Sequence, residues 1–126
     1  MRKIEQEMII AILSGMNNLA KSWEKGNTRV TTWVHRSSEL GFIEQVEIHV
    51  ALHGNTIARL SYGEHKQGKG WKMRLENCGW ATRTTHSRLN AIIVGITGLS
   101  HRFTSKDSSP KTFSKIGYNG TWRMSS

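Results

Sequence analysis

The sequence predicts an α+β domain with an N-terminal helix, a mainly antiparallel sheet of four or five strands, and a second helix packed on one face. Three observations indicate this fold. Apolar residues recur first at helical spacing, then at every second position, and finally at helical spacing again. A Gly-Asn pair separates two alternating runs, which is typical of an antiparallel hairpin. The 126 residues, 37% of them hydrophobic, suffice for one modest core, so we expect a single domain.

The first predicted element is an amphipathic helix over residues 3–25, ended by Gly26. Side chains three or four positions apart form its apolar stripe: Ile4, Met8, Ile12, Met16, Leu19 and Trp23. We expect this stripe to pack in the core. It is equally able to bury against a second copy of the chain, so a homodimer through this helix remains an alternative.

Two strands are predicted next, because the period of the apolar residues changes from 3.6 to two after Asn27. Thr28–Arg36 is rich in Thr, Val and Trp, which favour strands. Residues 46–52 alternate Val, Ile, Val and Leu with Glu, His and Ala. Gly54-Asn55 is predicted as a two-residue turn that leads into an antiparallel strand over Thr56–Tyr62.

A fourth strand is predicted over Trp71–Leu75. Its apolar residues alternate with Lys72 and Arg74, so these two cations are expected on the outward side of the sheet. Gly63–Gly70 precedes it and is predicted as a flexible basic loop. We expect the outward side of the sheet and this loop to form one positive surface.

The second helix is predicted to begin at Thr84 or Thr85 and to end at Thr97. Thr82 or Thr84 is its predicted N-cap, and Gly98 follows its last turn. Its apolar face consists of four residues at helical spacing: Leu89, Ile92, Ile93 and Ile96.

The last segment, residues 100–126, is polar and basic, and we expect a loop followed by a late strand within Lys115–Met124. The single domain thus comprises the N-terminal helix (residues 1–26), a strand-rich core with the second helix (27–99) and this tail (100–126).

The net charge of the chain indicates the class of molecule that it binds. Lys and Arg number 18 against nine acidic residues, which gives a net charge of +9. Cations exceed acids by one in residues 1–26, by four in residues 27–100 and by four in residues 101–126. The sheet and the tail are therefore expected to bind a polyanion, DNA or RNA, through its phosphate backbone.

The sequence gives no sign of membrane insertion or secretion. The longest apolar run, Met8–Leu13, is far shorter than the ~20 residues of a membrane span, and Glu5 and Glu7 interrupt any signal peptide before it. The lone Cys78 allows no internal disulfide. We expect a cytoplasmic protein.

Enzymatic signatures are weak, so we expect a non-catalytic protein without a cofactor. Residues 63–70 resemble a phosphate-binding P-loop, but Gly70 stands where a magnesium-binding Ser or Thr is needed, and the segment joins two strands. His49 and His53 would lie about 13 Å apart on a strand, too far to share a metal ion. Asp107 is the only aspartate, which argues against a two-metal nuclease.

The start of the second helix is a candidate anion site. Hydroxyls of three threonines lie there beside Arg83, His86 and Arg88, and free backbone amides at a helix N-terminus attract phosphate. Ordinary capping by the threonines is the alternative. With the sheet and its loop, the candidate nucleic-acid-binding residues are Arg59, Lys66, Lys69, Lys72, Arg74, Arg83 and Arg88.

Two segments resemble a recurrent pattern in a family of small proteins of tailed bacteriophages: LHGNTIA at residues 52–58 and GWxTxTTxxRLNAI at residues 79–92. The resemblance covers about residues 46–99, so the N-terminal helix is additional to it. It implies a phage origin and a compact unit of three strands and a helix, and it implies no catalytic residues.

Three functions fit these observations. The first is a phage-encoded accessory protein that binds nucleic acid. The second is an inhibitor of a host or defence protein, or of a protein–RNA complex, which would use the sheet and the aromatic residues of the tail. The third, a virion component, has the least support from the charge.

Overall fold

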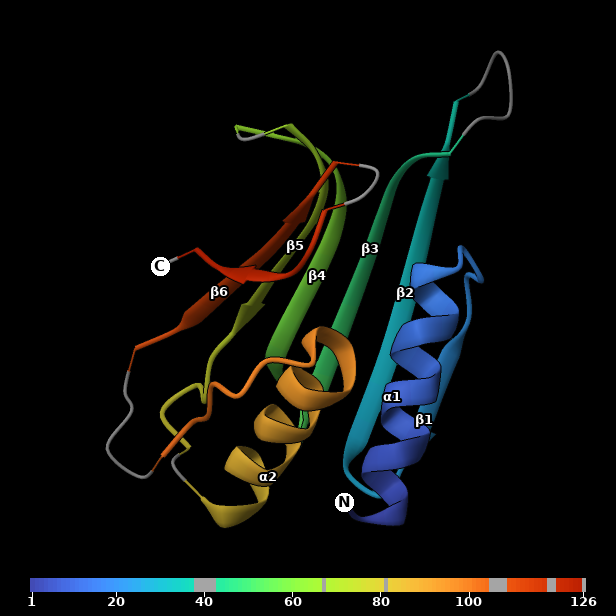
Figure 1. Ribbon diagram of the computed structural model, residues 1–126. Helices are drawn as coiled ribbons and strands as arrows, with labels where there is room; N and C mark the ends of the chain where they lie inside the picture. Colours follow the sequence, from blue (N-terminus) through green and yellow to red (C-terminus); the bar gives the residue numbers. More distant parts are fainter. Residues whose placement is uncertain (38–42, 67, 81, 105–108, 118–119, 126) are drawn as a thin grey trace.

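The computed structural model describes residues 1–37, 43–66, 68–80, 82–104, 109–117 and 120–125. They form two layers, a seven-stranded antiparallel sheet and two helices on one of its faces (Figure 1). The elements in chain order are α1 (Lys3–Met16), β1 (Ser22–Lys25), β2 (Thr28–Arg36), β3 (Ile43–Leu52), β4 (Asn55–His65), β5 (Gly68–Leu75), α2 (Arg83–Ile92), the π-helical turn η1 (Ile93–Thr97), β6 (Lys111–Ile116) and β7 (Arg123–Met124). The α+β class is confirmed, and the sheet is larger than the four or five strands predicted.

The strands lie in the sheet in the order in which they occur in the chain, and each is antiparallel to its neighbours. The predicted strand over Thr28–Arg36 has these bounds in the structure. Strands β4 and β5 pair as far as His65 and Gly68, so most of the predicted loop at residues 63–70 is strand. Gly70 is required there, because a Cβ at this position would collide with the backbone of Lys115 on β6.

The first helix is shorter than predicted. It ends at Met16, and Asn18 then adopts a positive φ of 69°. The chain returns as β1, in which Trp23 is partly buried from a strand rather than from a helix. Leu19, expected in the apolar stripe, is 53% exposed. The prediction of a helix to residue 25 is wrong, because Trp23 fits the helical spacing by coincidence.

The hairpin between β3 and β4 turns one residue earlier than predicted. Leu52 pairs with Asn55, so the turn consists of His53 and Gly54, with φ of 52° and 82°. Positive φ at both central residues is typical of a type I′ turn, whose twist matches that of the flanking strands. His53 therefore lies in the turn at the end of the sheet, and its side chain is exposed.

The core lies between the helices and one face of the sheet. Helix α1 packs on β1, β2 and β3, and α2 packs on β4 and on α1. The largest fully buried side chains come from every layer: Met8 and Ile12 of α1, Ile48, Leu60, Met73 and Phe113 of the sheet, and Leu89, Ile92 and Ile93 of α2 and η1. Burial of apolar surface on one face only leaves the other face of the sheet open.

The second helix is close to its prediction. It begins at Arg83 after Thr82, whose hydroxyl accepts a hydrogen bond from the Thr85 amide at 3.2 Å. It continues through η1 to Thr97, and Gly98 follows with φ of 71°. No helix within the described ranges is long and apolar enough to cross a membrane.

The tail contributes two strands, β6 beside β5 and the short β7 beside β6. The predicted late strand therefore corresponds to the end of β6 and to β7, and residues 118–119 between them lie outside the described residues. Trp122 packs partly buried against the core.

Candidate nucleic-acid interface

The face of the sheet opposite the helices, which we call the open face, carries the side chains that alternate with the buried ones along each strand. Because side chains alternate along a strand, Lys72 and Arg74 lie opposite to the buried Met73 and Leu75 and are exposed, as predicted. Arg59 on β4 faces Arg74 across the strand pair and is exposed as well. These three predicted residues lie together on the open face.

Arg59, Lys72 and Arg74 surround a shallow hollow of about 290 Å³, which we call the cationic hollow. Its remaining lining residues are Glu47, Ser61 and Thr112. Arg59 lies directly opposite Arg74, and Ser61 lies directly opposite Lys72, so the three cations occupy neighbouring positions on two strands. Two hydroxyl groups thus lie among three positive charges, a combination suited to phosphate oxygens.

The positive charge of the cationic hollow is only partly neutralised. Glu47 is bound to His49, with 2.8 Å between Oε1 and Nε2, and Glu76 lies 3.8 Å from one nitrogen of Arg74. Within the described part of the chain, Arg59 and Lys72 form no ion pair. Like charges directly opposite each other destabilise a strand pair. The Arg59–Arg74 pair therefore favours an anionic ligand.

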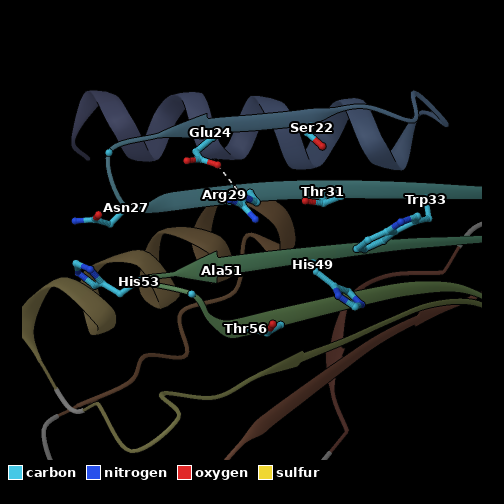
Figure 2. A pocket seen from close by; sticks show the side chains of 12 residues that line it. Ser22, Glu24, Asn27, Arg29, Thr31, Trp33, His49, Ala51, His53 and Thr56 are labelled. Atoms are coloured by element: carbon cyan, nitrogen blue, oxygen red, sulfur yellow. Dashed lines mark hydrogen bonds and ion pairs between the residues drawn. The ribbon is translucent and has the colours of Figure 1, made fainter.

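A second, larger hollow of about 810 Å³ lies beside the first, over β1, β2 and β3 (Figure 2). Trp33 lies at one end with 44% of its surface exposed, and its ring contacts the His49 ring edge to face at 4.8 Å. Arg29 pairs with Glu24 at 2.7 Å within it. His49 and Arg59 are cross-strand partners, so the two hollows meet along β3 and β4.

A family model for the Kyanoviridae Gp96 protein matches residues 1–111. The chain belongs to this phage protein family. The predicted resemblance to phage proteins is thereby confirmed, and the match includes α1, so the prediction that this helix is additional to the family is wrong. No curated protein and no solved structure matches the chain.

The remaining predicted site residues of this Gp96-family chain lie outside the cationic hollow. Lys66 is exposed at the tip of the β4–β5 hairpin. Lys69 places its Nζ 5.9 Å from the ring centre of Tyr62, which faces the helix side. The prediction of one surface for the loop and the open face is therefore wrong for Lys69. Arg83 is exposed at the start of α2 and lines a separate hollow with Arg102.

The prediction that Arg88 binds nucleic acid is wrong. Its predicted role needs an exposed guanidinium, but only 7% of the residue is exposed. One nitrogen donates to Glu5 at 2.8 Å, and Nε donates to the Thr28 hydroxyl at 3.2 Å. Arg88 thus ties α2 to α1 and β2 and is taken out of the candidate interface.

The partner of Arg88 is held in its charged form. Burial alone raises the pKa of Glu5, but hydrogen bonds from Ser87, from the Arg2 backbone and from Arg88, together with the Arg88 charge, outweigh burial and lower the pKa. Glu5 is 3% exposed, so the ion pair lies within the protein between the two helices.

Thr82 caps α2, as the alternative interpretation proposed, and Thr84 and Thr85 lie within the helix. Thr82 accepts from the Thr85 amide, and Thr85 is buried. The two histidines on β3 and its turn do not converge on a metal site, and the described residues contain no group of three potential metal ligands. Burial raises the pKa of the Cys78 thiol, which donates to the Thr56 carbonyl oxygen at 3.0 Å.

Sequence reasoning missed several residues of the open face, namely Arg29, Trp33, His49, Ser61, Thr112 and Arg123. A signal was present for those in β2 and β3, because Arg29 and Trp33 alternate with the buried Val30 and Thr32. Arg123 is exposed on β7 and pairs with Ser114, which pairs with Lys72. Its place next to the cationic hollow follows only from the pairing of β6 and β7.

Proposed function

We propose that this phage protein binds nucleic acid in the host cytoplasm through phosphate contacts on its open sheet face, without catalysis. The observation that carries the proposal is the cationic hollow. Arg59 and Arg74 face each other there beside Lys72, on a sheet face that no described segment covers. Phosphate between the three side chains removes their mutual repulsion and satisfies the Ser61 and Thr112 hydroxyls.

The overall charge supports the same proposal. The net charge of +9 draws a polyanion to the protein at long range, and the open face supplies the contacts at short range. Such binding depends steeply on salt, because each phosphate contact releases counterions from the nucleic acid. It carries little sequence preference, since phosphates are the same in every sequence.

The test compares two triple variants that remove the same number of charges. The first combines Arg59→Ala, Lys72→Ala and Arg74→Ala. The matched control combines Lys3→Ala, Lys21→Ala and Arg102→Ala, three exposed cations outside the open face. Affinity for random DNA and RNA oligonucleotides is measured by fluorescence anisotropy at four or more salt concentrations.

We expect the open-face variant to lose at least about tenfold in affinity and the slope of log K against log salt to flatten by about two to three units. The control variant should keep most of the slope. Equal losses in both variants would mean that general charge attraction, and not this face, binds the polyanion. If the unaltered protein binds no nucleic acid even at low salt, the proposal is wrong and a host or defence protein becomes the candidate partner.

A further inference from the structure

We infer that the open face binds single-stranded nucleic acid, with a base stacked on Trp33 while the backbone crosses the cationic hollow. This inference rests on the proposed function and names its substrate class. Trp33 is a large apolar side chain in the middle of β2, and 44% of it is left exposed on the open face. An indole is the strongest stacking surface that a protein offers to a base, and stacking accepts any base.

Trp33 is held in place before any ligand arrives. The His49 ring contacts it edge to face with 4.8 Å between ring centres, and Glu47 holds His49 through a contact of 2.8 Å. Glu47 is also the cross-strand partner of Trp33. The indole therefore loses little conformational freedom when a base stacks on it, which favours affinity.

The hollow next to Trp33 can take a base and its sugar. Its volume of about 810 Å³ lies within the range of small-molecule sites, and its lining offers donors and acceptors from Ser22, Asn27, Thr31 and Thr56 (Figure 2). Each can bond to a base edge or a sugar hydroxyl. The hollow is therefore chemically suited to unpaired nucleotides.

The position of Trp33 relative to the cations fits one continuous strand of nucleic acid. Trp33 is on β2 and Arg59 is on β4, which are two strand spacings apart, about 10 Å. His49 on β3 lies between them. A stacked base at Trp33 and its neighbouring phosphates at Arg59, Arg74 and Lys72 can thus belong to the same chain.

The breadth of the sheet argues against a duplex. Seven strands span roughly 29 Å, whereas the major groove of B-DNA is about 12 Å wide, so the open face cannot enter it. Bases within a duplex are stacked on each other and cannot reach Trp33. A duplex would touch only the cations, whereas a single strand uses both hollows.

The experiment measures binding of fluorescein-labelled single-stranded oligo-dT and oligo-U, and of a random duplex of the same length, to three single variants. Trp33→Leu keeps a large apolar side chain on β2 but removes the aromatic surface. Trp33→Phe restores an aromatic ring at the same place. Trp80→Leu is the matched control, since Trp80 is 57% exposed and lines a different hollow beside α2. Circular dichroism melts verify that each variant is folded.

The unaltered protein should bind the single strands at least about tenfold more tightly than the duplex. Trp33→Leu should weaken single-strand binding by about 5- to 100-fold, without changing the salt slope or the duplex affinity. Trp33→Phe should recover most of the loss, and Trp80→Leu should have no effect. The oligo-dT and oligo-U arms distinguish DNA from RNA as the preferred strand.

Two results separate this inference from the proposed function. If Trp33→Leu binds single strands as tightly as the unaltered protein while the open-face triple variant loses affinity, stacking is wrong and phosphate binding stands. If the duplex binds as tightly as the single strands, the substrate class is wrong. If neither variant loses affinity, both the stacking inference and the proposed function are wrong.

Discussion

The ion pair between Glu5 and Arg88 lies inside the protein, where most surfaces are apolar. Taking two charges out of water is costly, and their attraction repays this only when both partners are present with further hydrogen bonds. Here Thr28 and Ser87 supply those bonds. The arrangement makes each partner dependent on the other and ties α2 to α1 and to β2.

Replacing Arg88 with Ala should lower the free energy of unfolding by about 3 to 5 kcal/mol, because it leaves the buried Glu5 carboxylate unpaired. Denaturant titration followed by circular dichroism measures the loss. Arg83→Ala on the same helix is the control, since Arg83 is exposed and its removal should cost no more than about 0.5 kcal/mol. Equal stability of the two variants would contradict the buried role of Arg88.

The lowered pKa of Glu5 predicts loss of stability in acid. A carboxyl group with a depressed pKa in the folded state stabilises the protein fully above its unfolded pKa, and this contribution is lost as the pH falls through the folded pKa. Stability should therefore decrease progressively below about pH 4.5, the ordinary pKa of a glutamate. Melting temperatures between pH 7 and pH 3 measure this decrease. In Glu5→Gln the decrease should be smaller, and an identical pH profile would show that Glu5 does not titrate in this way.

At the scale of the elements, the C-terminal end of α1 lies close to the sheet. Gly15 allows this approach, because a Cβ there would collide with the Thr32 hydroxyl and press on Ile48. Glycine at this position costs up to about 1 kcal/mol in helix propensity relative to alanine, but it allows α1 to contact β2 and β3.

Gly15→Ala should destabilise the protein by about 1 to 3 kcal/mol, because the cost of overpacking exceeds the gain in helix propensity. Thermal unfolding measures the change, with Ser14→Ala as the control on the adjacent position. The double variant Gly15→Ala, Thr32→Ala should recover part of the loss, since it removes the colliding hydroxyl. A more stable Gly15→Ala protein would mean that α1 does not approach β2 so closely.

The elements differ in how well the sequence predicts them. Strand β2 follows from alternation, because one of its faces is buried and the other is open. The end of α1 and the existence of β1 do not, because Trp23 continues the helical spacing while Asn17 and Asn18 already end the helix. Strand β7 has two residues, too few for a pattern.

The same distinction holds for the candidate site. Alternation along one strand places Lys72 and Arg74 on the open face. It cannot reveal that Arg59 faces Arg74, because register between strands depends on the turn. Nor can it reveal that Arg88 is buried, since the partner that neutralises it lies 83 residues away in the chain. Pairing over such distances leaves no periodic signal.

At the scale of the whole molecule, the two faces of the sheet have different roles. The helix layer packs on one face of the sheet and contains the ion pair between α1 and α2. The other face is free of any described covering and carries the cationic hollow and Trp33. Stability and the proposed binding thus depend on opposite faces of the same strands, so substitutions on the open face can alter binding without disturbing the core.

The order of the strands also bears on how the chain folds. From β1 to β5 each strand pairs with the next one along the chain, mostly through tight hairpins, so closing each pair costs little chain entropy. Among the described contacts, the separation is large where β5 meets β6, after α2 has intervened, and where α1 meets α2, as in the pair of Arg88 and Glu5 across 83 residues. Pairing between strands that are neighbours in the chain favours rapid folding. The slowest loops to close are those that bring the helix layer and the last two strands onto it.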